Sequence, residues 1–197
     1  MNPPSASSLL SYSSLGDAAL ARVRVVLSHT SHPGNIGAAA RAMKTMGLSQ
    51  LVLVCPKTYP HDPAALAEAV ARSAGADDIL RAARICASVD EALAGCVHAV
   101  AVSARVRNLG PVPQTARQAV PEIVAQTAQG DVALLFGNET AGLSNEEVQQ
   151  CQRAVFIPAN PGYSSLNLGA AVQLLCYELR LAAHGGRRFA VVTTTPV

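Results

Sequence analysis

The chain has 197 residues, a length that fits one domain with its own hydrophobic core. Half of the residues are hydrophobic, yet the longest apolar runs, such as residues 132–136, are far shorter than the ~18 residues of a membrane-spanning helix. The N-terminus does not predict a secretory signal. The net charge is +2, and charged residues make up 14% of the chain, below the roughly 25% usual for soluble domains, which indicates that some surface is hidden or shared with a second copy.

The first half of the chain predicts a leader followed by alternating strands and helices. Residues 1–20, with the runs PPSASS and SYSS, have no helical or strand period and predict a flexible leader. The run VRVVLS (23–28) predicts a strand, HTSHPGNIG (29–37) a loop and AAARAMKTMG (38–47) a helix. LVLV (51–54) predicts a second buried strand, and residues 63–74 predict a helix. The spacing of Ser88 and Glu91 predicts a capping box, in a short helix that Gly95 ends.

The second half continues this alternation. VHAVAVSA (97–104) predicts a strand, followed by an arginine-rich loop and a helical stretch that Pro121 interrupts. DVALLFG (131–137) and RAVFIP (153–158) predict strands, and between them a capping box of Ser144 and Glu147 opens a short helix. A long helix is expected from Leu166 to about residue 183, and a tail over 184–197. We therefore predict a single α/β domain over 21–183, with a parallel sheet covered by helices on both faces.

The cysteines and arginines carry weaker signals. Five cysteines lie far apart without a C-x-x-C pair, which argues against a disulfide framework or a zinc site and favours a reduced cytoplasm. Cys55 and Cys176 stand in apolar segments and are predicted to be core residues. Arginine supplies 13 of the 15 cations, with Lys44 and Lys57 as the others. This preference suits phosphate binding, and it equally fits a genome of high GC content.

Three segments rich in Gly, Asn and Ser follow predicted strands, where parallel sheets bind their ligands. They are GNIGAAAR (34–41), FGNETAGLSNEE (136–147) and IPANPGYSSLNLGAAVQLLCYEL (157–179). Singly, each has a plainer interpretation: a helix start, a strand-to-helix turn, or a helix capped by Ser165. Arg41 stands out because it falls two turns into a helix of small and apolar residues. A nicotinamide-dependent oxidoreductase is disfavoured because G-x-G-x-x-G is absent, and so is the P-loop pattern.

Together the three segments resemble the motifs of the SpoU class of SPOUT methyltransferases. The first motif is Asn-x-Gly followed by Arg, the second is G-N-E-x-x-G-L-S (137–144), and the third is I-P-x-x-x-x-x-S-L-N before a helix that ends in Y-E. The resemblance covers residues 22 to about 183, and HTSHPGNIGAAARAMKTMGL, VSAR and NPGYSSLNL are similar to the TrmJ subgroup. Asn138 departs from members that carry Arg there, and the C-terminal extension of many relatives would be short or missing here.

The resemblance implies a deep C-terminal trefoil knot and an S-adenosylmethionine-dependent RNA ribose 2′-O-methyltransferase. The expected substrate is tRNA, at the cytidine or uridine of nucleotide 32 in the anticodon loop. The alternatives are another tRNA site, ribosomal RNA, or a non-catalytic RNA-binding module with the same fold. The resemblance also implies a homodimer without metal, and we expect a cytoplasmic protein with no membrane contact. The apolar face of the last helix supports the dimer, through Leu168, Val172, Leu175 and Leu179.

Carried over by motif, the cofactor pocket is formed by small and apolar residues, namely Val102, Ser103, Ala104, Gly137, Ile157, Ser164, Ser165 and Leu166. The catalytic set is Asn35, Arg41, Glu139, Ser165 and Asn167. Arg41 is the activator that the resemblance implies, but a guanidinium stays charged above pH 12, so stabilising alkoxide charge and positioning an RNA phosphate suit it better than acting as a free base. Glu139, Ser165 and Asn167 would orient Arg41, the loops or the ribose. His29 and His32 could contact RNA, but surface-loop histidines without a functional role are the favoured interpretation.

Overall fold

The structure is a computed structural model that describes residues 15–104 and 111–185. Most of the predicted leader (1–14), the arginine-rich loop (105–110) and most of the predicted tail (186–197) lie outside the described residues. Residues 15–20, which the sequence assigned to the flexible leader, form a helical turn instead, and Leu20 is fully buried. These six residues therefore belong to the folded domain, because Leu20 packs into its core.

A seven-stranded sheet in the order β3-β2-β1-β6-β4-β7-β5 forms the centre of the fold, and all its neighbouring strands are parallel. The parallel α/β sheet that the apolar runs predicted is thereby confirmed. The edge strands β3 and β5 were not predicted, because three residues carry no recognisable period. The strands are β1 (Val23–Ser28), β2 (Gln50–Val54), β3 (Arg84–Cys86), β4 (Cys96–Val102), β5 (Pro113–Thr115), β6 (Asp131–Phe136) and β7 (Arg153–Phe156).

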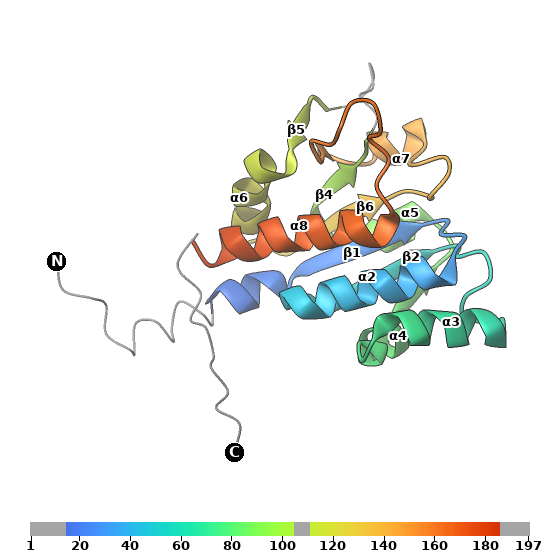
Figure 1. Cartoon of the computed structure of the whole chain (residues 1–197). Coiled ribbons are helices and arrows are strands. Elements are labelled where there is room, and N and C mark those ends of the chain that lie inside the picture. Colours follow the sequence, from blue (N-terminus) through green and yellow to red (C-terminus); the bar gives the residue numbers. More distant parts are fainter. Residues whose placement is uncertain (1–14, 105–110, 186–197) are drawn as a thin grey trace.

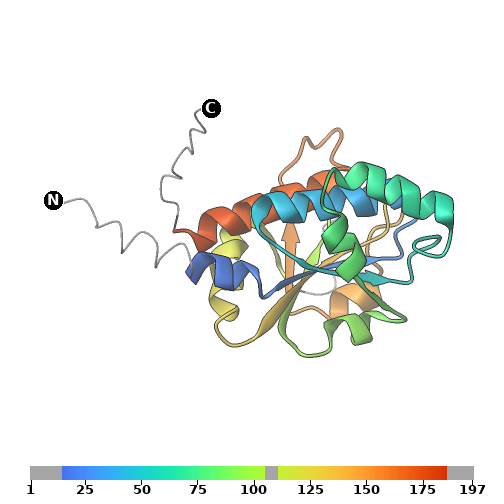
Figure 2. The ribbon, with the colours of Figure 1, turned by 90° about the horizontal axis from the view of Figure 1, so that it is seen from below.

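Helices cover both faces of this sheet, as predicted (Figures 1 and 2). Because side chains alternate along a strand, Val25 and Leu27 of β1 join one buried cluster and Val26 joins the other. The first cluster packs under α2 (Pro33–Met46), α3 (Pro63–Ser73), α4 (Asp77–Ala82), α6 (Ala116–Gln126) and α8 (Leu168–Ala183). The second packs under α5 (Val89–Leu93) and α7 (Asn145–Gln149). Among the described residues, no helix is long and apolar enough to span a membrane.

Three helices differ from the sequence-based expectation, two in where they begin and one in its continuity. Helix α2 begins at Pro33, five residues early, because proline fits the first helical position, where its missing N–H has no partner to lose. Helix α8 begins at Leu168 with Asn167 as its N-cap, so Ser165 does not cap it. Helix α6 continues through Pro121 without interruption. Pro121 itself is exposed, and the helix is stabilised by the burial of Ala119, Val120 and Ile123 against the sheet.

Glycines in the first and third motifs let two helices approach α2 closely. A Cβ on Gly37 would lie 2.1 Å from the carbonyl oxygen of Ala69 in α3. A Cβ on Gly169 of α8 would lie 2.7 Å from the Cβ of Ala38. The segment 34–41 is therefore helical and packed, rather than the ligand loop that its glycines predicted.

The predicted capping boxes are confirmed in one case and half-formed in the other. At α7, the Ser144 hydroxyl accepts from the Glu147 N–H, and the Glu147 carboxylate accepts from the Ser144 N–H at 2.6 Å. At α5, Ser88 accepts from the Glu91 N–H as expected. The Glu91 carboxylate instead accepts from the N–H of Ala87, at 2.8 Å. Both arrangements satisfy backbone donors that the helix itself leaves unpaired.

The five cysteines are free thiols, as their spacing predicted. Cys176 is fully buried in α8, which confirms the expectation for that residue. The same expectation was wrong for Cys55, whose side chain is exposed. Its backbone has a φ of 43° just after β2, which turns the chain away from the apolar strand.

Candidate functional site

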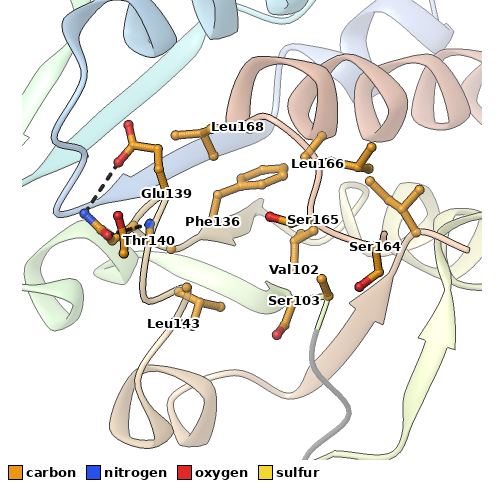
Figure 3. Close-up of a pocket in the computed structure, with 16 residues that line it drawn as sticks. Val102, Ser103, Phe136, Glu139, Thr140, Leu143, Ser164, Ser165, Leu166 and Leu168 are labelled. Carbon is orange, nitrogen blue, oxygen red and sulfur yellow. Dashed lines mark hydrogen bonds between the residues drawn. The ribbon is translucent and has the colours of Figure 1, made fainter. Parts of the chain in front are cut away.

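A cavity lies beyond the carboxyl ends of β4, β6 and β7, between the loops that follow them (Figure 3). The structure brings all eight residues predicted for the cofactor pocket to its wall, together with eight others. The lining residues are Val102, Ser103, Ala104, Phe136, Gly137, Asn138, Glu139, Thr140, Gly142, Leu143, Ile157, Ser164, Ser165, Leu166, Leu168 and Ala171. Their position matches the place where open parallel sheets bind ligands.

The loop after β6 is folded tightly against itself at Gly137. The Asn138 side-chain oxygen accepts from the N–H groups of Thr140 and Ala141, and the Gly142 N–H donates to the Asn138 carbonyl at 2.8 Å. A Cβ on Gly137 would lie 2.2 Å from the carbonyl carbon of Gly142. The returning backbone leaves no room for a side chain there, so glycine is required for the loop to form this wall of the cavity.

Glu139 joins this loop to the start of α2. Its carboxylate accepts hydrogen bonds from the Ser31 N–H at 3.0 Å, the Ser31 hydroxyl at 2.9 Å, the His32 N–H at 3.2 Å and the Asn35 side-chain amide at 3.0 Å. Burial alone would raise the pKa of Glu139, but the hydrogen bonds from Asn35 and Ser31 outweigh it and hold the pKa below its ordinary value. Glu139 is therefore a carboxylate at neutral pH.

The position of this carboxylate explains how α2 begins. The helix has His32 at its N-cap without a side-chain hydrogen bond, and no acidic residue in its first turn. The orphan N–H groups and the positive end of the helix dipole need an anion nearby. Glu139 supplies that anion from the loop after β6.

A second set of hydrogen bonds connects Glu139 and Asn35 to the start of α8. The Asn167 amide donates to the side-chain oxygen of Asn35 at 2.8 Å, and Asn35 donates in turn to Glu139. The Asn167 side-chain oxygen accepts from the N–H groups of Gly169 and Ala170 at the start of α8. The structure therefore brings Asn35, Glu139 and Asn167 together in one network that fixes three segments relative to one another.

Arg41 lies outside this network. Its side chain is exposed on α2, and among the described residues it forms no hydrogen bond and no ion pair. Although its neighbours in the sequence are small or apolar, Arg41 lies on the exposed side of α2, which leaves its guanidinium in water. Glu139 and Asn167 hydrogen-bond to Asn35 and to backbone N–H groups, and among the described residues neither forms a hydrogen bond with Arg41. Ser165 lies on the cavity wall.

The backbone partners of Glu139 were not predicted from the sequence, nor were cavity residues such as Phe136, Thr140 and Leu143. The signal that could have found them is the start of α2, which lacks an N-capping side chain of its own. His29 contributes in a similar way, because its carbonyl accepts from the Asn138 amide at 2.7 Å. His29 and His32 both have exposed side chains, as expected.

The charge of the cavity favours a cationic ligand. Glu139 is the one ionisable side chain among the described residues that line it, and the rest of the wall is apolar or carries hydroxyl and amide groups. No group of three His, Cys, Asp or Glu side chains that could hold a metal ion occurs in residues 15–104 and 111–185. The wall thus combines apolar surface, hydroxyls and one carboxylate.

Comparison with known proteins gives a consistent assignment. The sequence model of the SpoU rRNA Methylase family matches residues 22–177. A Pseudomonas aeruginosa protein named tRNA (cytidine/uridine/adenosine-2′-O-)-methyltransferase TrmJ is 54% identical over 164 residues, which cover 83% of this chain and 62% of that protein. The chain thus spans less than two thirds of the length of this curated relative.

Solved structures agree with the sequence comparison. TrmJ from Z. mobilis ZM4 superposes with a TM-score of 0.74 at 38% identity, covering 80% of this chain and 67% of that one. The SpoU methyltransferase AviRb from Streptomyces viridochromogenes, in complex with the cofactor AdoMet, superposes with a TM-score of 0.61 at 26% identity. That match covers 83% of this chain and 58% of AviRb.

Proposed function

The chain belongs to the SpoU rRNA methylase family, and on that basis we propose that it is an S-adenosylmethionine-dependent methyltransferase of tRNA ribose 2′-hydroxyl groups. The observation that carries this proposal is the cavity beyond β4, β6 and β7, where all eight residues predicted for the cofactor lie. The relative named TrmJ supports tRNA as the substrate, and its name gives cytidine, uridine and adenosine as target nucleosides. The pyrimidine of nucleotide 32 is the target that the motif resemblance implies. A tRNA substrate also fits the cytoplasmic location that the sequence predicts.

The residues of the cavity fit S-adenosylmethionine. Apolar side chains such as Ile157 and Leu166 suit the adenine ring, and the hydroxyls of Ser164 and Ser165 suit polar groups of the cofactor. The carboxylate of Glu139 favours the positive charge of a sulfonium, and no cationic side chain stands among the described lining residues to oppose it. The AdoMet complex of AviRb supports the same assignment.

The cofactor supplies an electrophilic methyl group, and the chain must make a ribose hydroxyl attack it. When bound, the cofactor would give its methyl group to the ribose oxygen and leave as S-adenosylhomocysteine, and the hydroxyl proton would pass to solvent water. We assign Arg41 to stabilising the developing negative charge and to binding an adjacent phosphate, because its guanidinium has no partner among the described residues. Asn35, Glu139 and Asn167 would hold the start of α2, and with it Arg41, in place.

A trefoil knot is also part of the proposal. The loops after β6 and β7 both line the cavity, and α8 follows the second of them directly. The hydrogen bonds that connect Glu139, Asn35 and Asn167 hold these loops against α2. Such a compact arrangement of the C-terminal loops supports the knot that the family resemblance implies.

We propose a homodimer that rests on a different face of α8 from the one that the sequence suggested. Leu168, Val172, Leu175 and Leu179 are all buried in the core of their own chain. The opposite side exposes Leu174 and Tyr177, at 40% and 45% of their surface. A hollow lined by Thr45, Met46, Tyr177, Arg180 and Leu181 continues this side toward α2. We propose that a second copy covers it.

We expect light scattering at micromolar concentration to give the mass of a dimer. Leu174→Arg should shift the mass to that of a monomer, because a charge on a buried apolar interface has no partner. Leu66→Arg is the matched control, since Leu66 on α3 is equally exposed at 40% and lies away from this surface. A monomer mass for the unaltered protein would remove the dimer from the proposal.

Calorimetry with S-adenosylhomocysteine tests the cofactor assignment. We expect binding that persists in excess EDTA, because the cavity wall offers hydroxyls, amides and apolar surface for the contacts. NADH serves as the control ligand and should not bind, since the glycine fingerprint of dinucleotide sites is absent. Binding of NADH in place of S-adenosylhomocysteine would contradict the proposed function.

A further inference from the structure

The cationic side chains of the described residues divide into two groups. Eight of them contact a carboxylate or a backbone carbonyl: Arg22, Arg24, Lys44, Arg81, Arg84, Arg117, Arg153 and Arg180. In residues 15–104 and 111–185, the side chains of Arg41, Lys57 and Arg72 form no hydrogen bond and no ion pair. All three are exposed.

These three residues come from different elements, and all of them lie on or beside α2. Arg41 stands on α2 itself, one turn beyond Gly37. Arg72 of α3 packs its stem against α2, with its Cβ 3.0 Å from where a Cβ on Gly37 would lie and its Cγ 3.5 Å from the same point on Gly34. Figures 1 and 2 show α3 alongside α2.

Lys57 reaches the same region from the loop after β2. Its N–H donates to the carbonyl of Thr30 at 3.0 Å, and the next two residues, Ser31 and His32, donate to Glu139. Lys57 therefore stands beside the loop that leads into α2. Together, Arg41, Lys57 and Arg72 form a surface that we call the α2 cationic face.

We propose that the α2 cationic face binds phosphates of the RNA backbone on either side of the nucleotide that is methylated. This inference rests on the proposed function, which supplies the RNA substrate. The face lies beside the loop that donates hydrogen bonds to Glu139. Unpaired guanidinium and ammonium groups suit phosphate oxygens, and each contact releases a counterion from the RNA. Arg72 and Lys57 would fix the register of the RNA without reading its bases.

Gly37 of the first motif also positions Arg72, because it lets α3 pack closely on α2. A side chain at Gly37 would push α3 away from α2, since its Cβ would lie 2.1 Å from the backbone carbonyl oxygen of Ala69. At Gly34 the nearest atom is the end of the Glu68 side chain at 2.6 Å, which can move aside. The close approach of the helices at Gly37 packs the stem of Arg72 against α2, the helix that carries Arg41. Glu68, one turn before Arg72, forms no ion pair with it among the described residues and leaves the guanidinium free.

Binding of unmodified tRNA to Arg72→Gln and Lys57→Gln tests the inference. Dissociation constants are measured by fluorescence anisotropy at several salt concentrations between about 50 and 200 mM. Each substitution should weaken binding about tenfold at low salt, because it removes a charge-assisted hydrogen bond. It should also reduce the slope of log K against log salt by about 0.7–0.9, the share of one phosphate.

Arg81→Gln is the matched control. It removes the same charge from an exposed arginine on the neighbouring helix α4, where Arg81 is already paired with Asp77. It should leave both the dissociation constant and the slope unchanged. Affinity for S-adenosylhomocysteine should be the same in all three variants, because none of the residues lines the cavity.

Two results would overturn the inference, and they are distinguishable. If the unaltered protein binds tRNA and neither Arg72→Gln nor Lys57→Gln changes the slope, the α2 cationic face is wrong and the proposed function stands. If the unaltered protein binds S-adenosylhomocysteine but not tRNA at any salt concentration, both the face and the tRNA substrate are wrong. Equal losses in Arg81→Gln would also overturn the inference, since the effect would then follow net charge.

Discussion

Arg41→Ala is expected to lower kcat by roughly 10²–10³, or about 2.7–4 kcal/mol of transition-state stabilisation. The reason is that the ribose oxygen gains negative charge as its proton leaves, and a guanidinium is a donor that stays charged at every working pH. Affinity for S-adenosylhomocysteine should barely change, because Arg41 does not line the cavity. Single-turnover methylation of tRNA and calorimetry on the same samples measure the two effects.

Two controls separate a catalytic role of Arg41 from a structural one: the melting temperature of Arg41→Ala and the activity of Arg41→Lys. Because Arg41 is exposed and unpaired among the described residues, its loss should leave the melting temperature unchanged. Arg41→Lys should restore little activity, since an ammonium cannot form the two-pronged contact of a guanidinium with phosphate and ribose. A variant Arg41→Ala that melts early or loses its dimer would point to a pairing role at an interface. One that methylates at the normal rate would leave the mechanism without its central residue.

The alternation of strands and helices was predictable because it follows from side-chain burial. The residues of β1 and nearly all of those in β6 are buried. The sequence of β6 is therefore a continuous apolar run after Asp131, and that of β1 is apolar except for Arg24 and Ser28. The start of α2 was not predictable from local pattern. Pro33, Gly34 and Asn35 are turn-forming residues, and the anion that stabilises the helix start is Glu139, about a hundred residues later in the chain.

The cavity wall could be predicted from the sequence motifs, whereas the exposed face of α8 could not. The motif resemblance named residues that the structure places on one wall, because those motifs follow neighbouring parallel strands. The face of α8 that packs inward could not be chosen from the sequence, since both sides carry leucines. Leu175 fills the core, whereas Leu174 lies 40% exposed one position earlier. Burial depends on the sheet below the helix, which local periodicity does not describe.

Gly137→Ala is expected to weaken the binding of S-adenosylhomocysteine at least about 100-fold, or ~2.7 kcal/mol. The added methyl would lie 2.2 Å from both the carbonyl carbon of Gly142 and the backbone nitrogen of Leu143. Backbone atoms cannot rotate out of the way as the end of a flexible side chain can. The loop after β6 would have to open, and with it the wall that carries Asn138 and Glu139.

Gly162→Ala provides the matched control in another loop beside the same cavity. There the added methyl would meet only the Asn160 side-chain oxygen at 3.5 Å, an ordinary contact, so binding should stay within about twofold. Melting temperatures separate loop opening from global unfolding. Displacing the loop also pulls Glu139 from the start of α2, so Gly137→Ala should melt lower by an amount that reflects about 1–3 kcal/mol. Unchanged affinity and unchanged melting in Gly137→Ala would show that the loop relaxes freely, and the cavity would then not depend on the close backbone contact that defines its wall.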